Sequence, residues 1–431
     1  MHIPKLLVRA ACTKTTTATA TATPIKTLPP TSTAAPTPTP EPTPEPVGLD
    51  YSIPSAWTVT NISRSYDDIN HRAQEAIDVM RDSYWKDPSK VDFGWGTGTT
   101  LSALAYKDMV ASTNNNRDTV RNILAAAKKN NANFDPYCYN DDAMWWGTTA
   151  MYAYRAYHDD EFLGWAKDVW NWVQPSQITP DQAKAGKTPV RPDGTMQSTC
   201  DGKTVAGGVF WRPECGSKDN MGTNVITTGL FQTLSAYLAE ATGEQKYTDA
   251  AVSAYTYITD HLILDGRDIP GDSIGLEECK KNNWIFTYNT GKFVEGAVVL
   301  SHVTKDDKYK ETALKAIVEA VKHVDNWQDE QGEITEGQDG DPSKGGDGRQ
   351  FKSIYVRALT EVSRREWNNP DLRALLTAYI NIQYNNLVTK ATDNKGNYGV
   401  VWKGPYQGPY QHGQANALDL LVAGIEFNWQ R

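Results

Sequence analysis

From residue 51 onward, apolar residues recur every three to four positions, which is the spacing of an amphipathic helix. Several neighbouring helical segments are joined by a short polar turn followed by an aromatic residue or leucine and then small residues, as in "TGEQKYTDAAVSAY" and "TKDDKYKETALKAI". This degenerate repeat indicates helical hairpins. The pattern predicts twelve helices, at residues 66–86, 97–112, 116–130, 141–157, 159–174, 221–242, 245–264, 286–304, 306–324, 350–366, 369–386 and 411–428.

Twelve helices in six hairpins fit a closed ring, in which inner helices face an axis and outer helices wrap around them. An open solenoid usually shows a crisper repeat and capped ends. The sequence therefore predicts an all-α fold, an (α/α)6 barrel, over residues 51–431. Three long stretches rich in Gly, Pro and Asp lie between helices, at residues 175–220, 265–285 and 325–349. Loops of this length are commonly functional, and we expect them to surround one mouth of the ring.

Residues 1–50 have a different composition. A Thr/Ala/Pro tract at 13–46 has too few apolar residues to build a core, so we predict a disordered, O-glycosylated stalk over 1–50. Such stalks are typical of secreted, cell-surface or cell-wall proteins, and the sequon at Asn61 agrees with that location. The first twelve residues are too short to supply the apolar region of a signal peptide. We expect any anchoring to come from the N-terminal side.

Charge and apolar content restrict the classes of partner that the protein can bind. The net charge is −9, and no stripe of Lys and Arg offers the concentrated positive charge that nucleic acid requires. The longest apolar stretches fall far short of the roughly 20 residues that span a bilayer. All 14 Trp, 21 Tyr and 9 Phe residues lie after residue 50, and exposed aromatic faces suit sugar rings, although a large core also uses them. Nothing in the sequence requires a dimer, so we expect a monomer.

Cysteine usage favours an oxidising compartment. Four of the five cysteines, Cys138, Cys200, Cys215 and Cys279, lie in the globular part without CxxC spacing. Three pairings are open, and four reduced thiols are the alternative. Because Cys200 and Cys215 bracket one Gly-rich loop, we predict the pairs Cys200–Cys215 and Cys138–Cys279.

The segment "DPYCYNDDAMWWGTTAMYAY" holds the strongest candidate for chemistry. In it Asp141 and Asp142 open a helix, with Trp145 and Trp146 one turn later and tyrosines just before. Carboxylates at helix starts commonly cap free N–H groups, and this explains three other Asp-Asp pairs, at 67–68, 159–160 and 306–307. None of those three has the same aromatic surroundings. Hydrolysis of a glycosidic bond with retention uses two carboxyl groups about 5–5.5 Å apart, and neighbouring aspartates can supply them.

Two weaker clusters follow. In "TVAGGVFWRPEC", Trp211 either forms the floor of a sugar subsite or packs the loop against the core. In "WIFTYNTGKFVEGA", Tyr288 and Asn289 begin a helix, where an asparagine is an ordinary N-cap as well as a possible ligand of a sugar hydroxyl. The histidines show no metal-ligand spacing and there is no phosphate loop, so we expect neither metal nor cofactor. We interpret the GxSxG string at 271–275 as chance, because no buried strand precedes it, and the acidic loop with Asp339, Asp341 and Asp347 as solvated.

Taken in order, the clusters resemble glycoside hydrolase family 76, the endo-α-1,6-mannanases and their fungal cell-wall relatives. The resemblance rests on "YNDDAMWWGTTA", "AGGVFW", "TNVITTGLF", "FTYNTGKFVEGA", "FKSIYVRAL" and "GQANALDLL". It implies an (α/α)6 barrel and retention, with Asp141 as nucleophile and Asp142 as general acid/base. It also implies sugar contacts at Trp146, Trp211, Asn224, Tyr288 and Asn289. Departures from the family pattern at Thr223, Thr290 and Ser353 bear on subsite specificity.

The predicted function is that of a retaining endo-α-1,6-mannanase, which would cut α-1,6-linked mannose backbones of cell-wall mannan or related mannose-containing glycans without a cofactor. Two alternatives stay open. The first is a cell-wall transglycosylase that moves a mannose-bearing anchor glycan onto wall polysaccharide. The second is a wall protein that binds mannan without turning it over.

Overall fold

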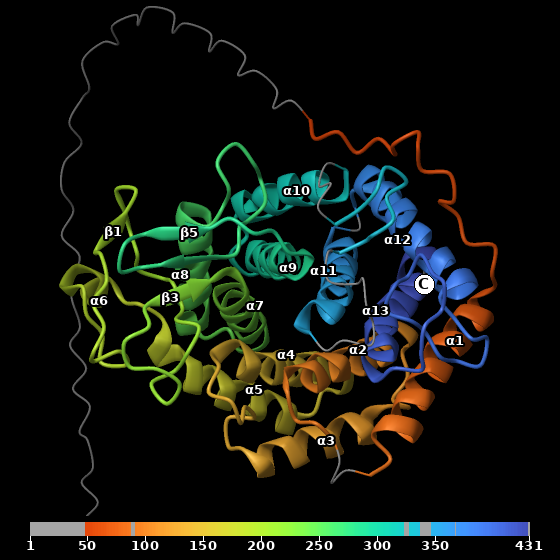
Figure 1. Ribbon diagram of the computed structural model, residues 1–431, viewed down its shortest axis with the longest axis horizontal. Coiled ribbons are helices and arrows are strands. Elements are labelled where there is room, and N and C mark those ends of the chain that lie inside the picture. Colours follow the sequence, from red (N-terminus) through yellow and green to blue (C-terminus); the bar gives the residue numbers. More distant parts are fainter. Residues whose placement is uncertain (1–47, 88–90, 323–326, 337–345, 367, 430–431) are drawn as a thin grey trace, which may run out of the picture. The chain divides into compact units, whose positions relative to one another are not determined.

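Six inner helices form a ring, and six outer helices wrap around it (Figure 1). Each inner helix contacts the next one along the chain, and the last contacts the first, which closes the ring. The computed structural model describes residues 48–429 except 88–90, 323–326, 337–345 and 367, so the predicted stalk lies almost wholly outside the described residues. The inner helices are α2 (Trp95–Ala111), α4 (Asn140–Tyr157), α7 (Val225–Thr242), α9 (Thr287–Thr304), α11 (Phe351–Arg365) and α13 (Gln411–Asn428).

The outer helices alternate with the inner ones along the chain. They are α1 (Tyr66–Val79), which continues into the π-helical turn η1 (Met80–Tyr84), α3 (Arg117–Asn130), α5 (Asp160–Val173), α8 (Gln245–His261), α10 (Asp307–Lys322) and α12 (Pro370–Lys390). All twelve predicted helices are present, and the predicted all-α (α/α)6 architecture is confirmed. The short helix α6 (Pro180–Ala185) is additional. No helix in the described part of the chain is long and apolar enough to cross a membrane.

Burial distinguishes the two rings. In α7, every residue from Val225 to Ala239 is buried, whereas α3 buries one stripe, Val120, Ile123, Leu124 and Ala127, as expected for a helix with one face in water. Glycine allows the inner helices to pack closely, because a Cβ atom on Gly291 would lie 2.9 Å from the Cα atom of Tyr355 on α11. Small residues on inner helices therefore set how tightly the ring closes.

The connections between helices place the long loops at one mouth. Each inner helix except α13, the last in the chain, leads into the next outer helix through a short turn, and α4 and α7 end in left-handed residues, His158 and Gly243. The inner helices therefore all run in the same direction. The segments that precede their N-termini include all three predicted long loops, so these loops meet at the mouth formed by those N-termini.

Two small antiparallel sheets and two short 3₁₀ turns give order to the mouth loops. Strand β3 (Gly222–Asn224) pairs with β4 (Ser273–Gly275), and β4 pairs with β5 (Lys280–Asn282). This sheet joins the loop before α7 to the loop before α9. The remaining elements are the hairpin of β1 (Thr199–Cys200) and β2 (Lys203–Thr204) and the turns η3 (Gln174–Ser176) and η4 (Asp347–Gln350).

The disulfides are Cys138–Cys215 and Cys200–Cys279, so the predicted pairing is wrong. The β1–β2 hairpin carries Cys200 to the turn between β4 and β5, where its Cα atom lies 5.5 Å from that of Cys279. Cys215 instead lies against the segment that precedes α4. Closeness along one loop was a poor guide, because the strands within that loop separate its two cysteines.

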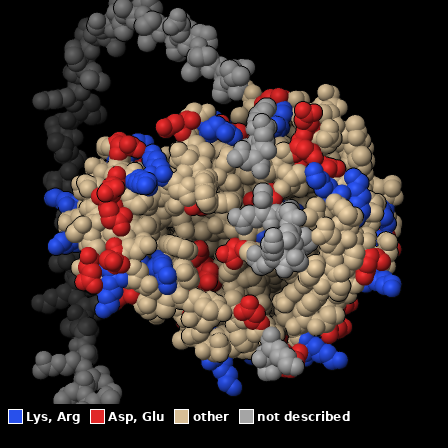
Figure 2. Space-filling model, in the orientation of Figure 1, with Lys and Arg blue, Asp and Glu red and all other residues tan. Residues whose placement is uncertain are grey.

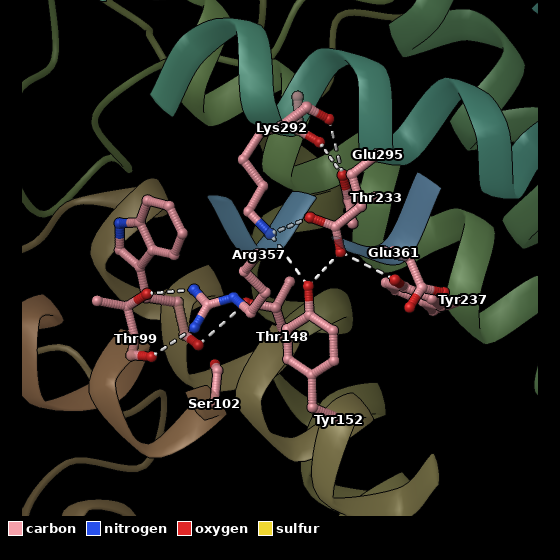
Figure 3. A network of polar contacts seen from close by, with 12 residues as sticks. Thr99, Ser102, Thr148, Tyr152, Thr233, Tyr237, Lys292, Glu295, Arg357 and Glu361 are labelled. Carbon is pink, nitrogen blue, oxygen red and sulfur yellow. Dashed lines mark hydrogen bonds and ion pairs between the residues drawn. The ribbon is translucent and has the colours of Figure 1, made fainter. Parts of the chain in front are cut away.

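A buried network of charged and polar side chains lies between the inner helices (Figure 3). Lys292 donates to Glu295 over 2.7 Å, and Tyr152 and Tyr237 also donate to Glu295. Arg357 donates to Thr99 and to Asp419, 3.1 Å away. Because a buried charge is tolerated only when it is paired and hydrogen-bonded, these contacts fix the inner helices relative to one another. Glu361 extends the network through Tyr106, Arg155 and Arg365.

Replacing Arg357 with Leu should leave the Asp419 carboxylate buried without its cation. We expect the free energy of unfolding, measured by urea denaturation, to fall by about 3–5 kcal/mol. The matched control is Arg81→Ala, which removes an arginine paired with solvent-exposed Asp78 and Asp82 and should cost less than about 1 kcal/mol. Equal losses from the two variants would contradict the proposed contribution of the buried network to stability.

Candidate active site

Asp141 and Asp142 lie in the first turn of α4, at the mouth where the inner helices begin. Asp141 is 9% exposed, and Asp142 is half-buried. The backbone N–H of Asp142 donates to Asp141 Oδ1 over 3.1 Å, as is typical of a carboxylate at a helix N-terminus. Asp135 stabilises the turn before the helix, because its carboxylate accepts hydrogen bonds from the backbone N–H groups of Tyr137 and Tyr139 over 2.8 and 2.7 Å.

Trp211 reaches this pair from the loop between α6 and α7. Its indole Nε1 donates to Asp141 Oδ2 over 3.1 Å, and its ring lies 4.9 Å from that of Tyr139, measured between centroids. The loop is held there by Asn140, whose backbone N–H donates to Trp211 O over 2.9 Å and whose side chain donates to Phe210 O over 2.8 Å. With 38% of its surface exposed, Trp211 both contacts Asp141 and remains partly open to solvent.

Burial and neighbouring charges raise the pKa of both aspartates. For Asp141 the main cause is burial, opposed by hydrogen bonds from backbone N–H groups and Trp211. For Asp142 burial is again the main cause, and the negative charges of Asp141, Asp135 and Asp347 raise its pKa further. Asp141 thus has donors that stabilise a carboxylate, whereas Asp142 faces charges that favour its protonated form.

The start of α9 supplies the next part of the site. The Tyr288 ring stacks on Phe351 with centroids 3.7 Å apart. Burial is the main cause of the raised Tyr288 pKa, and the negative charges of Asp272 and Asp141 raise it further. Asn289 is buried and donates to Asp272 Oδ1 over 3.2 Å, while its own Oδ1 has no hydrogen-bond partner among the described residues.

The structure therefore places Asp141, Asp142, Trp211, Tyr288 and Asn289 around one mouth. Asn224 caps α7 by accepting from Thr227 N over 2.9 Å, and it pairs with Ser273 across β3 and β4. Ser273, its partner across the sheet, directly follows Asp272 in the chain.

Trp146 does not fit its predicted role as a sugar contact. It is fully buried, its ring is stacked on Phe134 at 6.1 Å, and it lies against Gly98 of α2. The adjacent Trp145 lies seven residues before Tyr152 and therefore on the same face of α4, the face that contributes to the buried network. The Lys292 ammonium lies 5.6 Å from the centre of the Trp145 ring. Helical phase, rather than closeness to the aspartates along the chain, separates the two tryptophans.

Sequence reasoning missed three acidic residues that shape the site: Asp135, Asp272 and Asp347. Asp347 was interpreted as part of a solvated loop; it is exposed, but it accepts from Trp95 Nε1 over 3.2 Å and raises the Asp142 pKa. Asp339 and Asp341 of the same loop lie outside the described residues. Asp272 falls within the GxSxG string and links Asn289 to the sheet. For Asp135 and Asp347 the available signal was their position shortly before the inner helices α4 and α11, whereas Asp272 directly precedes strand β4 and carries no such signal.

The face shown in Figure 2 is hollowed near its centre, with acidic atoms bordering the hollow. Acidic side chains at one mouth raise the question of a metal site. No group of three or more His, Cys, Asp or Glu side chains among the described residues is arranged to hold a metal ion.

Comparison with known proteins identifies the family. The model for glycosyl hydrolase family 76 matches residues 194–425. The chain belongs to this family. A mannan endo-1,6-alpha-mannosidase of Candida glabrata is 27% identical over 176 residues, which cover 40% of this chain and 36% of the relative. A protein of the same name from Saccharomyces cerevisiae is 24% identical over 292 residues, covering 66% of this chain and 60% of the relative. The chain thus spans less than two thirds of the length of these curated relatives.

Solved structures share the fold of this family 76 chain. An inactive variant of an alpha-1,6-mannanase from Salegentibacter, with two consecutive aspartates replaced by alanine and alpha-1,6-mannotetrose bound, superposes with a TM-score of 0.65 at 17% identity. The match covers 84% of this chain and all of that one. Dfg5 from Chaetomium thermophilum, in complex with glucosamine, gives a TM-score of 0.67 at 18% identity, covering 86% of this chain and 92% of that one.

The two disulfides offer a matched test of how Trp211 is held. They close loops of nearly equal length, with sequence separations of 77 and 79 residues, so replacing either pair with serines should cost a similar free energy of unfolding, about 4 kcal/mol. We expect loss of Cys138–Cys215 to accelerate hydrogen exchange at 131–142 and 208–217. Loss of Cys200–Cys279 should accelerate exchange at 199–204 and 273–282 instead. Unchanged exchange at 208–217 in the first variant would show that hydrogen bonds, rather than the disulfide, hold the loop.

Proposed function

We propose that this protein is a retaining endo-α-1,6-mannanase, which hydrolyses α-1,6-linked mannose backbones. The observation that carries the proposal is the unequal environment of two adjacent carboxyl groups at the mouth of the ring. Asp141 accepts hydrogen bonds from Trp211 Nε1 and from the Asp142 backbone N–H, whereas Asp142 faces three negative charges. A pair of titratable groups whose surroundings favour opposite protonation states is the arrangement that retaining glycosidases use.

In this proposal, Asp141 is the nucleophile. Its carboxylate attacks the anomeric carbon of the mannosyl unit, the glycosidic C–O bond breaks, and a covalent glycosyl-enzyme ester forms. The hydrogen bonds from Trp211 to Oδ2 and from the Asp142 N–H to Oδ1 favour the carboxylate form of Asp141 against the effect of burial, and they hold both of its oxygens in place. The charge of Asp141 disappears as the ester forms.

Asp142 is the general acid/base. It donates its proton to the departing glycosidic oxygen, and the resulting carboxylate then removes a proton from the incoming water, which attacks the ester and releases the sugar with its original anomeric configuration. Formation of the ester removes the Asp141 charge, so the Asp142 pKa falls between the two steps. This change suits a group that first gives and then takes a proton.

Trp211, Tyr288, Asn289 and Asn224 are the proposed sugar contacts. Trp211 is partly exposed beside the nucleophile, and Asn289 is hydrogen-bonded to Asp272 at the start of α9. Trp146 is left out because its ring packs against Phe134 and Gly98. Aromatic faces with a few fixed polar groups are the usual composition of a sugar site.

The relatives support this assignment of substrate and location. Their names specify mannan endo-1,6-alpha-mannosidases from yeasts, and the Salegentibacter mannanase variant that lacks two consecutive aspartates is described as inactive with alpha-1,6-mannotetrose bound. We propose α-1,6-mannan or a related mannose-containing glycan as substrate, and the cell wall or cell surface as the location. We further propose that the protein acts as a monomer, without a cofactor.

Incubation with debranched α-1,6-mannan tests the proposal. The wild type should release reducing ends and short oligomers, with the α anomer formed first as seen by NMR. Asp141→Asn should lower kcat more than a thousandfold, and Asp142→Asn about a hundred- to ten-thousandfold, with unfolding free energies that remain high enough for a native fold. Longer products without new reducing ends would indicate transglycosylation, and binding without product would indicate a mannan-binding protein; either result would contradict hydrolysis.

Asp347 provides a test of how Asp142 stays protonated. Because the Asp347 charge raises the Asp142 pKa, Asp347→Asn should lower that pKa. Asp142 would then lose its proton at lower pH, and the alkaline limb of kcat/KM against pH should move to lower pH, less so in high salt because Asp347 is exposed. The acidic limb reports protonation of Asp141. Because the pKa of Asp141 is raised, activity should fall with decreasing pH at a higher pH than that at which an ordinary aspartate becomes protonated.

The control is Asp181→Asn on α6, which changes the net charge equally at an exposed position. It should leave both limbs in place. The same shift in both variants would mean that overall charge, rather than Asp347 itself, sets the alkaline limb.

A further inference from the structure

Trp284 is the most exposed large hydrophobic side chain among the described residues, with 67% of its surface accessible. It lies between the end of β5 at Asn282 and the start of α9 at Thr287. Its backbone is anchored, because Trp284 N donates to Asn282 Oδ1 over 3.2 Å and the next residue, Ile285, packs against the core. A large aromatic ring is thus held in water by a fixed backbone, at the cost of leaving its apolar area unburied.

A line of rings connects Trp284 to the proposed active site. The Trp284 ring is 6.2 Å from that of Phe286, which is 6.0 Å from Tyr288. Tyr288 stacks on Phe351, and the Asp141 charge contributes to its raised pKa. All of these rings except that of Phe351, which is buried, are partly or largely exposed. The line therefore runs along the mouth from the carboxylates to Trp284.

Hydrogen bonds follow the same route. Asn282, which accepts from Trp284 N, donates to Asp272 Oδ2 over 3.3 Å, and Asp272 Oδ1 accepts from Asn289 in the site. The three residues before Trp284, Lys281, Asn282 and Asn283, also line a pocket of about 350 Å³. An exposed aromatic ring next in the chain to polar side chains is a combination that suits a pyranose ring and its hydroxyls.

We propose that Trp284 forms an outer sugar subsite, which stacks against a mannosyl unit several positions along the chain from the bond that is cut. This inference rests on the proposed function and deepens it, because it predicts that long α-1,6-mannan chains are preferred over short ones. Trp284 contacts a distant part of the substrate and leaves the reacting atoms untouched. It is a specificity-determining residue.

The test compares Trp284→Ala with the wild type on α-1,6-mannotetraose and on debranched α-1,6-mannan. We expect kcat/KM for mannan to fall about three- to tenfold, as for loss of one stacking contact, with kcat/KM for the tetrasaccharide unchanged. Trp284→Phe should restore most of the loss. The matched control is Trp429→Ala, which removes a tryptophan with 40% exposure just after the end of α13, at the opposite mouth of the ring; both substrates should be unaffected.

Two results would overturn the subsite. Equal loss on both substrates would place Trp284 in the inner site, and no loss on mannan would leave its ring without a ligand. If the wild type cleaves no α-1,6-mannan, the proposed function fails independently. Calorimetric titration of debranched mannan into Asp141→Asn, with and without Trp284→Ala, then still decides the subsite: a three- to tenfold weaker affinity with Trp284→Ala supports it, and equal affinity refutes it.

Discussion

Closure of the inner helical ring around a buried charged network is the constraint on which the rest of this structure depends. Lys292, Glu295, Arg357 and Asp419 are almost completely buried, and each would be strongly unfavourable there alone. Together with Tyr152, Tyr237 and Thr99, they connect α2, α4, α7, α9, α11 and α13 through short hydrogen bonds. A helix that slipped along its neighbour would leave a buried charge unpaired, so the network fixes the relative heights of all six N-termini.

Those N-termini define the proposed active site. Because the inner helices run in the same direction, their free N–H groups and the positive ends of their dipoles gather at one mouth. Asp141 benefits directly, through the N–H of Asp142. Burial raises the pKa of Asp142, and the other acidic residues at this mouth raise it further. The same fold thus gives one carboxylate hydrogen-bond donors and surrounds its neighbour with charges that favour the protonated form.

The mouth loops add the groups that the ring itself lacks. The disulfide Cys138–Cys215 and the bonds from Asn140 bring Trp211 to Asp141, and the β3–β4–β5 sheet brings Asp272 to Asn289. Aromatic rings then extend from Tyr288 to Trp284 along the rim. The ring positions the proposed chemistry, and the loops decide what binds there.

Local sequence patterns were enough to predict the helices and to single out the candidate aspartate pair. Apolar periodicity predicted all twelve helices, because each must bury a stripe or a whole surface, and the aromatic surroundings of Asp141 and Asp142 distinguished them from three other Asp-Asp pairs. Motifs along the chain also indicated the family. These features are local, so they can be recognised without knowing which distant segments meet.

Which residues share a surface became clear from the packing of the helices and loops. It separated Trp145 from Trp146, since one helical step moves a ring from the axis to the packing against α2. It paired Cys138 with Cys215, because strands inside the long loops reverse the chain. It also brought Asp347 within electrostatic reach of Asp142, 205 positions earlier in the chain. Contacts of this kind depend on ring closure, and no local pattern of residues encodes them.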